Sequence, residues 1–176
     1  MIEIRPIDRA HKGDARLPNE PFPLWGRLLP AYSEGRWSHS VREFDQDERG
    51  EMCFPDEDYD WESMSGDTLF LGAYEGEQCV GLAVLQRGFF RYLYLADLKV
   101  KRSHRRRGVA ARLMEKAGEA AREQGLMGVY TIAQDNNLSA CLFYLKTGFR
   151  IGGLDTEVYN GTAQQGKADI LFYLDV

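Results

Sequence analysis

Two groups of residues in the second half of the chain have the types and spacing needed for chemistry on an anionic ligand. The first is the basic run Lys99–Arg107, which leads directly into Gly108. The second begins at Asn137 and reaches Tyr144 seven residues later. Guanidinium groups and helix N–H groups bind phosphate, and a phenol with a pKa of about 10 can donate a proton to a leaving group. The pair therefore suggests a polyanion site followed by a proton donor.

The basic run enters a helix that we expect from Gly108 to Gln124, with Gly125 as its stop. Acidic side chains are favoured at the positive end of a helix, so the arginines at 105–107 are unfavourable there unless an anion binds. Gly108 allows close backbone approach, and alanines at 110 and 111 keep the first turn small. The charge run alone fits a solvated basic turn equally well. The Gly-x-Ala spacing after a strand favours phosphate, and neither a Walker loop nor a dinucleotide-binding turn occurs.

The second group predicts a short helix from Asn137 to about Thr147, capped by Asn137 and ended by Gly148. Positions 137, 140 and 144 fall on one face of that helix, so Tyr144 has a route to a cleft. The alternative is a half-buried aromatic with its hydroxyl at the surface. Tyr144 gains its chemical interpretation from the neighbouring anion motif.

The elements around these motifs form an α+β pattern. We expect short helical turns and loops over 19–37, because prolines interrupt this segment. The run at 127–133 is expected to lie parallel to the strand before the helix, as βαβ spacing implies. Expected strands are 2–6, Thr68–Tyr74, Val80–Gln86, Phe89–Val100, Met127–Ala133, Arg150–Val158 and Lys167–Leu174.

Length and composition predict a single domain spanning residues 1–176. The net charge of −5 argues against general nucleic-acid binding, although an acidic stretch at 43–67 contrasts with the basic run. That stretch is either an attractor of cationic molecules or a solvated, partly disordered loop. No apolar run or leader-like segment predicts a membrane span, and three scattered cysteines predict no disulfide framework or metal site. A cytoplasmic protein is expected.

The two motifs together resemble the GNAT (Gcn5-related) N-acetyltransferase superfamily. The pattern Arg/Gln-x-x-Gly-x-Gly/Ala is met by Arg105, Gly108 and Ala110. The pattern Asn-x-x-Ala-x-x-Phe/Leu-Tyr followed by Gly-Phe is met by Asn137, Ala140, Phe143, Tyr144, Gly148 and Phe149. The resemblance covers nearly the whole chain. It implies a mixed, mostly antiparallel central sheet that is splayed at the cofactor site and has helices on both faces.

Within the superfamily the chain is most similar to the streptothricin acetyltransferase branch. Segments that carry this similarity include Asn19–Phe22, Asp56–Asp60 and Gly152–Thr156, together with Gln134. The chain departs from that branch at Ala96 and Ile132, where the branch has acidic residues on central strands.

The resemblance implies acetyl-CoA as co-substrate, with its pyrophosphate over backbone N–H groups of 105–111 and its pantetheine along 98–100. Arg102 or Arg106 would pair with further phosphate oxygens. Cofactor-binding residues are then Leu98, Lys99, Val100, Arg105, Arg106, Arg107, Gly108, Val109, Ala110, Ala111, Asn137, Ala140 and Tyr144.

The implied reaction needs a base and an acid. An alkylammonium with a pKa of about 10.4 must lose a proton before it attacks, and Asp97 is the candidate that receives it directly or through water. An equal alternative for Asp97 is a structural carboxylate that caps or pairs within the strands. Tyr144 would reprotonate the CoA thiolate. Candidate acceptor-binding residues are Trp25, Tyr32, Asp56, Asp58, Asp60, Tyr94 and Asp155, although core packing explains tryptophans equally well.

Three functions remain open from the sequence. The first is acetylation of a primary amine of a small, cationic molecule, such as a streptothricin-like or lysine-like antibiotic. The second is acetylation of a protein N-terminus or lysine side chain. The third is a non-catalytic acetyl-CoA-binding module. Oligomeric state is open between monomer and homodimer.

Overall fold

The computed structural model describes residues 1–88 and 90–176, which divide into two compact units. The first unit contains residues 1–20, 54–129 and 175–176, and the second contains 21–53 and 130–174. The first unit is built on four antiparallel strands in the order β1-β6-β7-β8. Its elements are β1 (Ile2–Pro6), the 3-10 helix η1 (Arg9–Arg16), α1 (Trp61–Met64), β6 (Thr68–Glu75), β7 (Gln78–Arg87), β8 (Tyr92–Val100), the 3-10 turn η2 (Arg102–His104) and α2 (Val109–Glu123).

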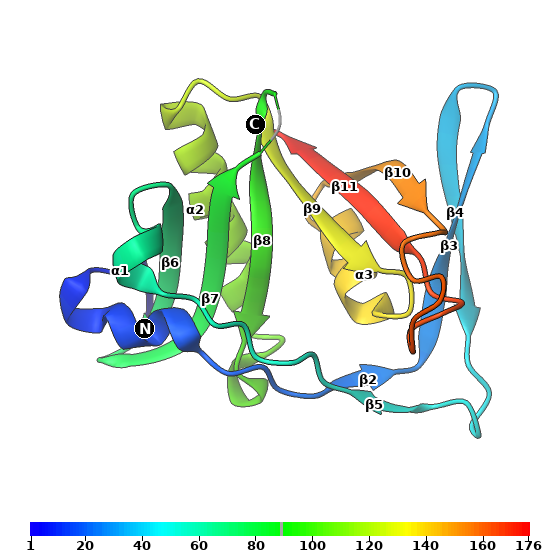
Figure 1. Cartoon of the computed structure of the whole chain (residues 1–176), viewed down its shortest axis with the longest axis horizontal. Helices are drawn as coiled ribbons and strands as arrows, with labels where there is room; N and C mark the ends of the chain where they lie inside the picture. The colour runs from blue at the N-terminus through cyan, green and yellow to red at the C-terminus, as the bar shows by residue number, and fades with distance from the viewer. Residues whose placement is uncertain (89) are drawn as a thin grey trace. The chain divides into compact units, whose positions relative to one another are not determined.

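Helices cover both faces of this sheet, as Figure 1 shows. The helix α2 packs on one face, where Gly81 of β7 leaves room for Val109 and Leu113. On the other face η1 and α1 cover a buried cluster that includes Leu82 and Val84. Alternation along β7 thus separates two apolar layers, because successive strand side chains point to opposite faces.

A β-bulge interrupts the pairing of β7 with β8. Val84 pairs with Asp97, whereas Leu85 pairs with Leu95, so Ala96 is the extra residue. A bulge bends its strand and redirects the side chains that follow it. The bulge therefore sets the direction of the Asp97 side chain, because Asp97 directly follows the extra residue.

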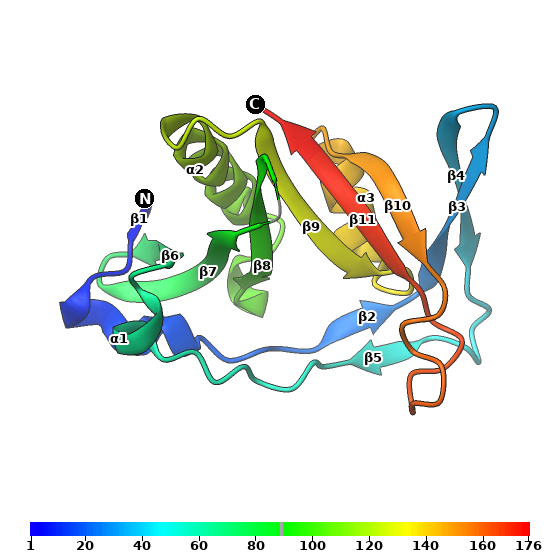
Figure 2. The same ribbon diagram turned by 45° about the horizontal axis from the view of Figure 1, so that its top comes forward.

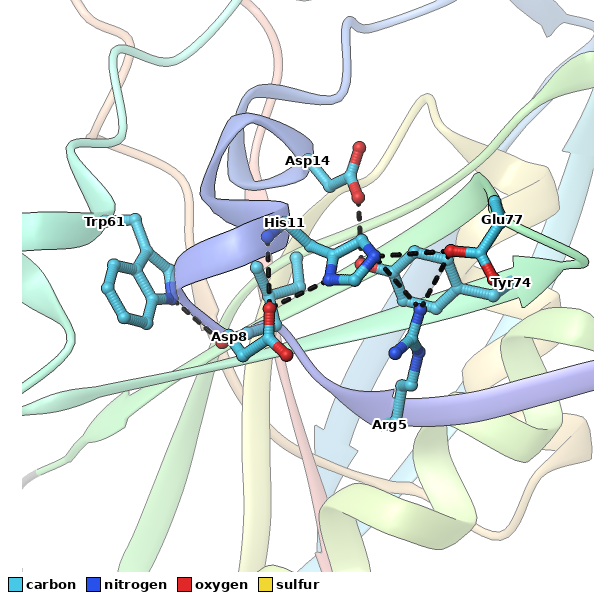
Figure 3. Close-up of polar contacts among 8 residues, drawn as sticks. Arg5, Asp8, His11, Asp14, Trp61, Tyr74 and Glu77 are labelled. Carbon is cyan, nitrogen blue, oxygen red and sulfur yellow. Dashed lines mark hydrogen bonds and ion pairs between the residues drawn. The ribbon is translucent and has the colours of Figure 1, made fainter.

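Polar contacts anchor η1 to the sheet (Figure 3). Asp8 caps η1 by accepting the N–H of His11, and its carboxylate lies 2.8 Å from His11 Nδ1. The buried Tyr74 donates its hydroxyl to Asp14 at 2.9 Å. Trp61 of α1 donates its indole N–H to the backbone oxygen of Ile7, which ties α1 to the same end of the sheet.

The second unit contains a three-stranded sheet in the order β9-β11-β10 and two smaller antiparallel pairs, β2 with β5 and β3 with β4. The helix α3 lies on one face of the three-stranded sheet, as Figures 1 and 2 both show. The elements of the second unit are β2 (Phe22–Leu24), β3 (Gly26–Ser33), β4 (Arg36–Glu43), β5 (Gly50–Met52), β9 (Gly128–Gln134), α3 (Leu138–Lys146), β10 (Arg150–Asp155) and β11 (Asp169–Asp175). The first two residues of β9 and the last residue of β11, Asp175, fall in the first unit.

The prediction of helical turns and loops over 19–37 is wrong, because this segment forms β2, β3 and the start of a hairpin with β4. Its prolines are compatible with strands because each pair has only two strands and therefore only edges, where a missing N–H is tolerated. Pro23 pairs with Glu51, and Pro30 pairs with His39.

The predicted α+β class and the helix α2 are confirmed, and the other predicted strands are found with bounds shifted by a few residues. The start expected for β8, Phe89, lies outside the described residues. No helix in the described part of the chain is long and apolar enough to cross a membrane.

Candidate active site

The N-terminus of α2 has backbone N–H groups that are available to an anion. Gly108 is its N-cap in the left-handed conformation, with φ of 78°, and provides no side-chain cap. The first intrahelical bond runs from Arg112 N to Gly108 O, so the N–H groups of residues 109–111 precede the helical ladder. Arg106 is also left-handed, with φ of 63°. Left-handed residues in such a turn gather N–H groups into an anion-binding concavity.

The arginines of this turn have different roles. Arg105 donates to the backbone oxygens of Val100 and Glu20, at 3.0 and 3.1 Å, and thereby fixes the loop after β8. Arg107 forms an ion pair of 3.2 Å with Glu75. Arg106 is exposed, and no described residue is an ion-pair partner for it. Arg106 is therefore the side chain most available to a phosphate, while Arg105 shapes the turn.

A carboxylate already uses part of this loop. The backbone N–H of Arg102 donates to the side chain of Glu20, which also lies 3.9 Å from the Arg105 guanidinium. The loop thus binds an acidic group within the first unit itself. This contact shows that one N–H group of the loop, that of Arg102, binds a carboxylate.

Asp97 on β8 lies in a largely buried ionic cluster. Its Oδ2 is 2.9 Å from Lys99 Nζ, and Lys99 also binds Glu57. Burial raises the pKa of Asp97 to about 6, although Lys99 opposes the shift and Glu57 adds to it. A carboxyl group with this pKa can accept a proton near neutral pH, as a general base must.

Aromatic rings border the same cluster. Tyr59 packs edge-on against Phe70, and Lys99 Nζ lies 5.9 Å from the Tyr59 ring centroid. Burial raises the pKa of Tyr59, and the charges of Asp97 and Glu57 raise it further, as Tyr94 also does. The cluster therefore combines Asp97 with the predicted Tyr94 and with two residues that the sequence did not single out, Glu57 and Tyr59.

The acidic positions predicted around Glu57 point elsewhere. Asp56 accepts the backbone N–H of Asn19 at 2.6 Å, Asp58 forms an exposed ion pair with Arg16 at 3.1 Å, and Asp60 is the N-cap residue of α1. Charge density alone could not separate these residues from Glu57. Glu57 is distinguished by its contact with Lys99, which binds the same oxygen, Oε2, that accepts from the Asn19 side chain.

Tyr144 lies in the aromatic core of the second unit and is only 6% exposed. Its ring centroid lies 5.2 to 5.4 Å from those of Phe143, Phe149 and Phe172. Asn137 caps α3 by accepting the N–H of Ala140, as the motif predicts. The motif thus fixes the ring of Tyr144 by packing and the start of its helix by a cap.

The remaining predicted acceptor residues of the second unit occupy separate positions. Trp25 donates its indole N–H to Ser139 at 2.8 Å, so it braces α3. Tyr32 is 62% exposed, and its ring centroid lies 4.9 Å from that of Trp37 in the β3–β4 hairpin, with the two ring planes tilted. Asp155 ends β10 and accepts the N–H groups of Glu157 and Val158.

The two departures from the similar branch have clear structural settings. Ala96 is the bulge residue of β8 and packs against the buried cluster under α1. Ile132 on β9 is 40% exposed. Among the described residues, no three His, Cys, Asp or Glu side chains gather as metal ligands.

Comparison with known proteins agrees with this geometry. The family model "Acetyltransferase (GNAT) family" matches residues 35–149. Streptothricin acetyltransferase A of Bacillus subtilis (strain 168) is 32% identical over 160 residues, which cover 91% of this chain and 92% of that protein.

Two solved structures share the fold over the full length. One is a Bacillus anthracis (strain Ames) protein assigned as a streptothricin acetyltransferase and solved in complex with acetyl coenzyme A, with a TM-score of 0.89, 26% identity and complete coverage of both chains. The other is a nourseothricin acetyltransferase with a TM-score of 0.80 and 24% identity, covering 99% of this chain and 98% of that one. The second likeness concerns the fold alone.

Proposed function

The chain belongs to the acetyltransferase (GNAT) family and is an acetyl-CoA-dependent N-acetyltransferase, and we propose that its acceptor is a primary amine of a small cationic molecule of the streptothricin type. The acceptor class rests on similarity to streptothricin acetyltransferase A over nine-tenths of the chain. The observation that carries the donor is the uncapped start of α2 behind left-handed Arg106 and Gly108.

Acetyl-CoA would be held mainly by backbone groups. The N–H groups of residues 105–111 would receive the pyrophosphate, and Arg106 would supply a mobile positive charge. Leu98, Lys99 and Val100 on β8 would run beside the pantetheine arm. The fit is supported by the glycine at 108, because its left-handed backbone disfavours any residue with a Cβ.

The reaction forms a C–N bond and breaks a C–S bond. The amine nitrogen attacks the thioester carbonyl carbon, and the resulting intermediate expels the CoA thiolate. The proton of the amine passes to Asp97, directly or through water, and Tyr94 would contribute to the path. The raised pKa of Asp97, about 6, supports its role as the acceptor of that proton.

Tyr144 would return a proton to the thiolate. A phenol with a pKa of about 10 can protonate the conjugate base of a thiol with a pKa of about 8.5 when the two are within hydrogen-bond reach, because the hydrogen bond tightens as charge develops on sulfur. Packing by three phenylalanines restricts the ring to one orientation, which supports a positioned acid.

The acceptor would be attracted by negative charge. The stretch 43–67 contains Asp56, Asp58 and Asp60, and exposed carboxylates raise the local concentration of a cation and its encounter rate. Trp25 and Tyr32 would contribute aromatic surface to the acceptor. We place the reaction in the cytoplasm, carried out by a single domain of residues 1–176 as a monomer or homodimer.

A panel of amines tests this function. Streptothricin, lysine, polyamines, aminoglycosides and peptides are incubated with acetyl-CoA, and released CoA thiol is measured beside the mass of the product. Turnover of small cationic amines with little turnover of peptides is expected. Preferential turnover of peptides would replace the proposal by protein acetylation, and acetyl-CoA binding without turnover of any amine would indicate a binding module.

A further inference from the structure

Two carboxylates stand directly opposite each other in the second unit. Asp155 on β10 and Asp169 on β11 are cross-strand partners. Cβ atoms of such partners lie roughly 4.5–5.5 Å apart, and like charges in this arrangement are destabilising. Burial raises the pKa of Asp169, and the negative charges of Asp155 and Asp135 raise it further. The pair thus has an electrostatic cost for which a bound cation would compensate.

A third polar group lies in the same row of the sheet. The bond from Asp135 N to Ala168 O places Gln134 beside Asp169, and the stacking of Tyr130 on Tyr173 follows the same register. This row lies on the face opposite α3, because Phe172, one residue before Tyr173, points to Tyr144 of α3. Figure 2 shows α3 behind β9, β11 and β10, which leaves the other face of these strands without a helix of this unit.

Asp155 and Asp169 each keep one carboxylate oxygen available for a ligand. Asp155 uses Oδ1 to accept the N–H groups of Glu157 and Val158, and Asp169 uses Oδ1 to accept the Tyr159 hydroxyl at 2.7 Å. In the described part of the chain nothing donates to the Oδ2 atom of either.

Gln134 provides an independent sign of a ligand. The residue is 9% exposed, its Oε1 atom is buried, and no described residue donates to that oxygen. Its amide contacts the Tyr159 hydroxyl, which places it at the Tyr159–Asp169 pair. Buried amide oxygens without a donor are rare in folded proteins, because the oxygen loses its hydrogen bonds to water without replacement.

Neighbouring cations are committed elsewhere. The Arg27 guanidinium binds Asp135 at 2.6 Å and the backbone oxygen of Gly166 at 2.8 Å. Lys167 donates to Gln164. The carboxylates of Asp155 and Asp169 are therefore not neutralised by either side chain.

We propose that Asp155, Asp169 and Gln134 bind an alkylammonium group of the acceptor, and that this group is not the one acetylated. The inference rests on the proposed function. An alkylammonium has three N–H donors, which match the two Oδ2 atoms and Oε1. A carboxylate pair favours the charged form of an amine and raises its pKa, which opposes nucleophilic attack. The site therefore selects acceptors with at least two amino groups, of which one stays protonated.

The experiment uses the full chain and two probes with the same five-carbon chain, 1,5-diaminopentane and 1-aminopentane. Unfolding temperature is measured with each amine, and the rate of acetylation is measured with acetyl-CoA. The variants are Asp169→Asn, Asp155→Asn and the double change, with Asp175→Asn as matched control. Asp175 lies at the other end of β11 and also accepts a tyrosine hydroxyl, from Tyr92 at 2.6 Å.

The diamine is expected to raise the unfolding temperature of the wild-type and Asp175→Asn proteins, and not that of the double variant. Where turnover occurs, each single change should raise KM for the diamine about tenfold, the effect of one charge-assisted hydrogen bond, and leave KM for 1-aminopentane unchanged. Without amine, Asp169→Asn should unfold at a higher temperature than wild type, because the repulsion is removed.

The two proposals fail in different ways. Diamine stabilisation that depends on Asp155 and Asp169, in a protein that acetylates no amine, would keep this site and overturn the acceptor function. If wild type and the double variant both acetylate amines and prefer the diamine over the monoamine to the same extent, the function stands and this site is overturned. An absence of diamine stabilisation in wild type would also overturn the site.

Discussion

Lys99 Nζ lies 2.9 Å from Asp97 Oδ2, and the two side chains are only 9% and 13% exposed. Lys99 also binds Glu57, so one ammonium lies between two carboxylates. Burial lowers the pKa of Lys99, but its two carboxylate partners outweigh that effect and the net shift is upward. Lys99 therefore stays charged, while Asp97 is the group of the cluster that titrates near neutral pH.

The first prediction concerns how kcat/KM depends on pH through the protonation of Asp97. As a base, Asp97 acts only when charged, so kcat/KM of the wild type should rise as pH increases through about 6. This rise is the acidic limb of the pH profile. Asp97→Asn should lose the acidic limb and lower kcat/KM by about 10²-fold, while the further rise caused by deprotonation of the amine remains. An exposed control, Asp47→Asn, should keep the wild-type profile. An unchanged limb in Asp97→Asn would assign the proton to another group.

The second prediction uses Glu57 to shift that limb. The negative charge of Glu57 raises the pKa of Asp97, so Glu57→Gln should lower it and move the limb to lower pH. Asp58→Asn is the matched control, because Asp58 is on the same segment and pairs with Arg16 at the surface. The measurement is kcat/KM from pH 5 to 8. A limb that moves equally in both variants would indicate a general charge effect.

The third prediction tests the anion turn. Gly108 has a φ of 78°, and an added Cβ meets no atom within 4 Å, so Gly108→Ala changes backbone strain without a clash. Left-handed alanine costs about 1 kcal/mol, and KM for acetyl-CoA should rise about fivefold with a smaller effect on kcat. Gly13→Ala, also without contacts, is the control. Equal acetyl-CoA affinity in Gly108→Ala and wild type, measured by calorimetry, would argue against this turn as the phosphate site.

The fourth prediction separates packing from acid catalysis at Tyr144. Tyr144→Phe keeps the ring that contacts Phe143, Phe149 and Phe172, so the unfolding temperature should change little. Loss of the hydroxyl should lower kcat by about 10²-fold and change acetyl-CoA affinity much less. Tyr92→Phe removes a surface hydroxyl and serves as control. Full kcat in Tyr144→Phe would remove the acid assignment.

The sequence predicts the starts of α2 and α3 well because they are local. Gly108 at the start of α2 and Asn137 at the start of α3 depend on backbone geometry and caps, which neighbouring residues determine. The same holds for β6 and β7, whose apolar alternation and turn chemistry lie within one hairpin.

The pairing of Asp155 with Asp169 could not be predicted in the same way, because it depends on long-range register. Nothing in the spacing of Asp155 and Asp169 indicates that they are cross-strand partners, and the bulge between Ile151 and Gly153 moves the register of β10. Likewise, Glu57 differs from its acidic neighbours only through its contact with Lys99. The prolines at 23 and 30 misled the prediction, because edge strands accept them.

The central claim is that this chain acetylates an amine of a small cationic molecule, and mass spectrometry of streptothricin after incubation with the protein and acetyl-CoA tests it most directly. The expected product carries one added acetyl group on an amine and forms together with one equivalent of free CoA thiol. Unmodified streptothricin and no acetylated product from any small amine, in a protein that acetylates peptides or only binds acetyl-CoA, would contradict it.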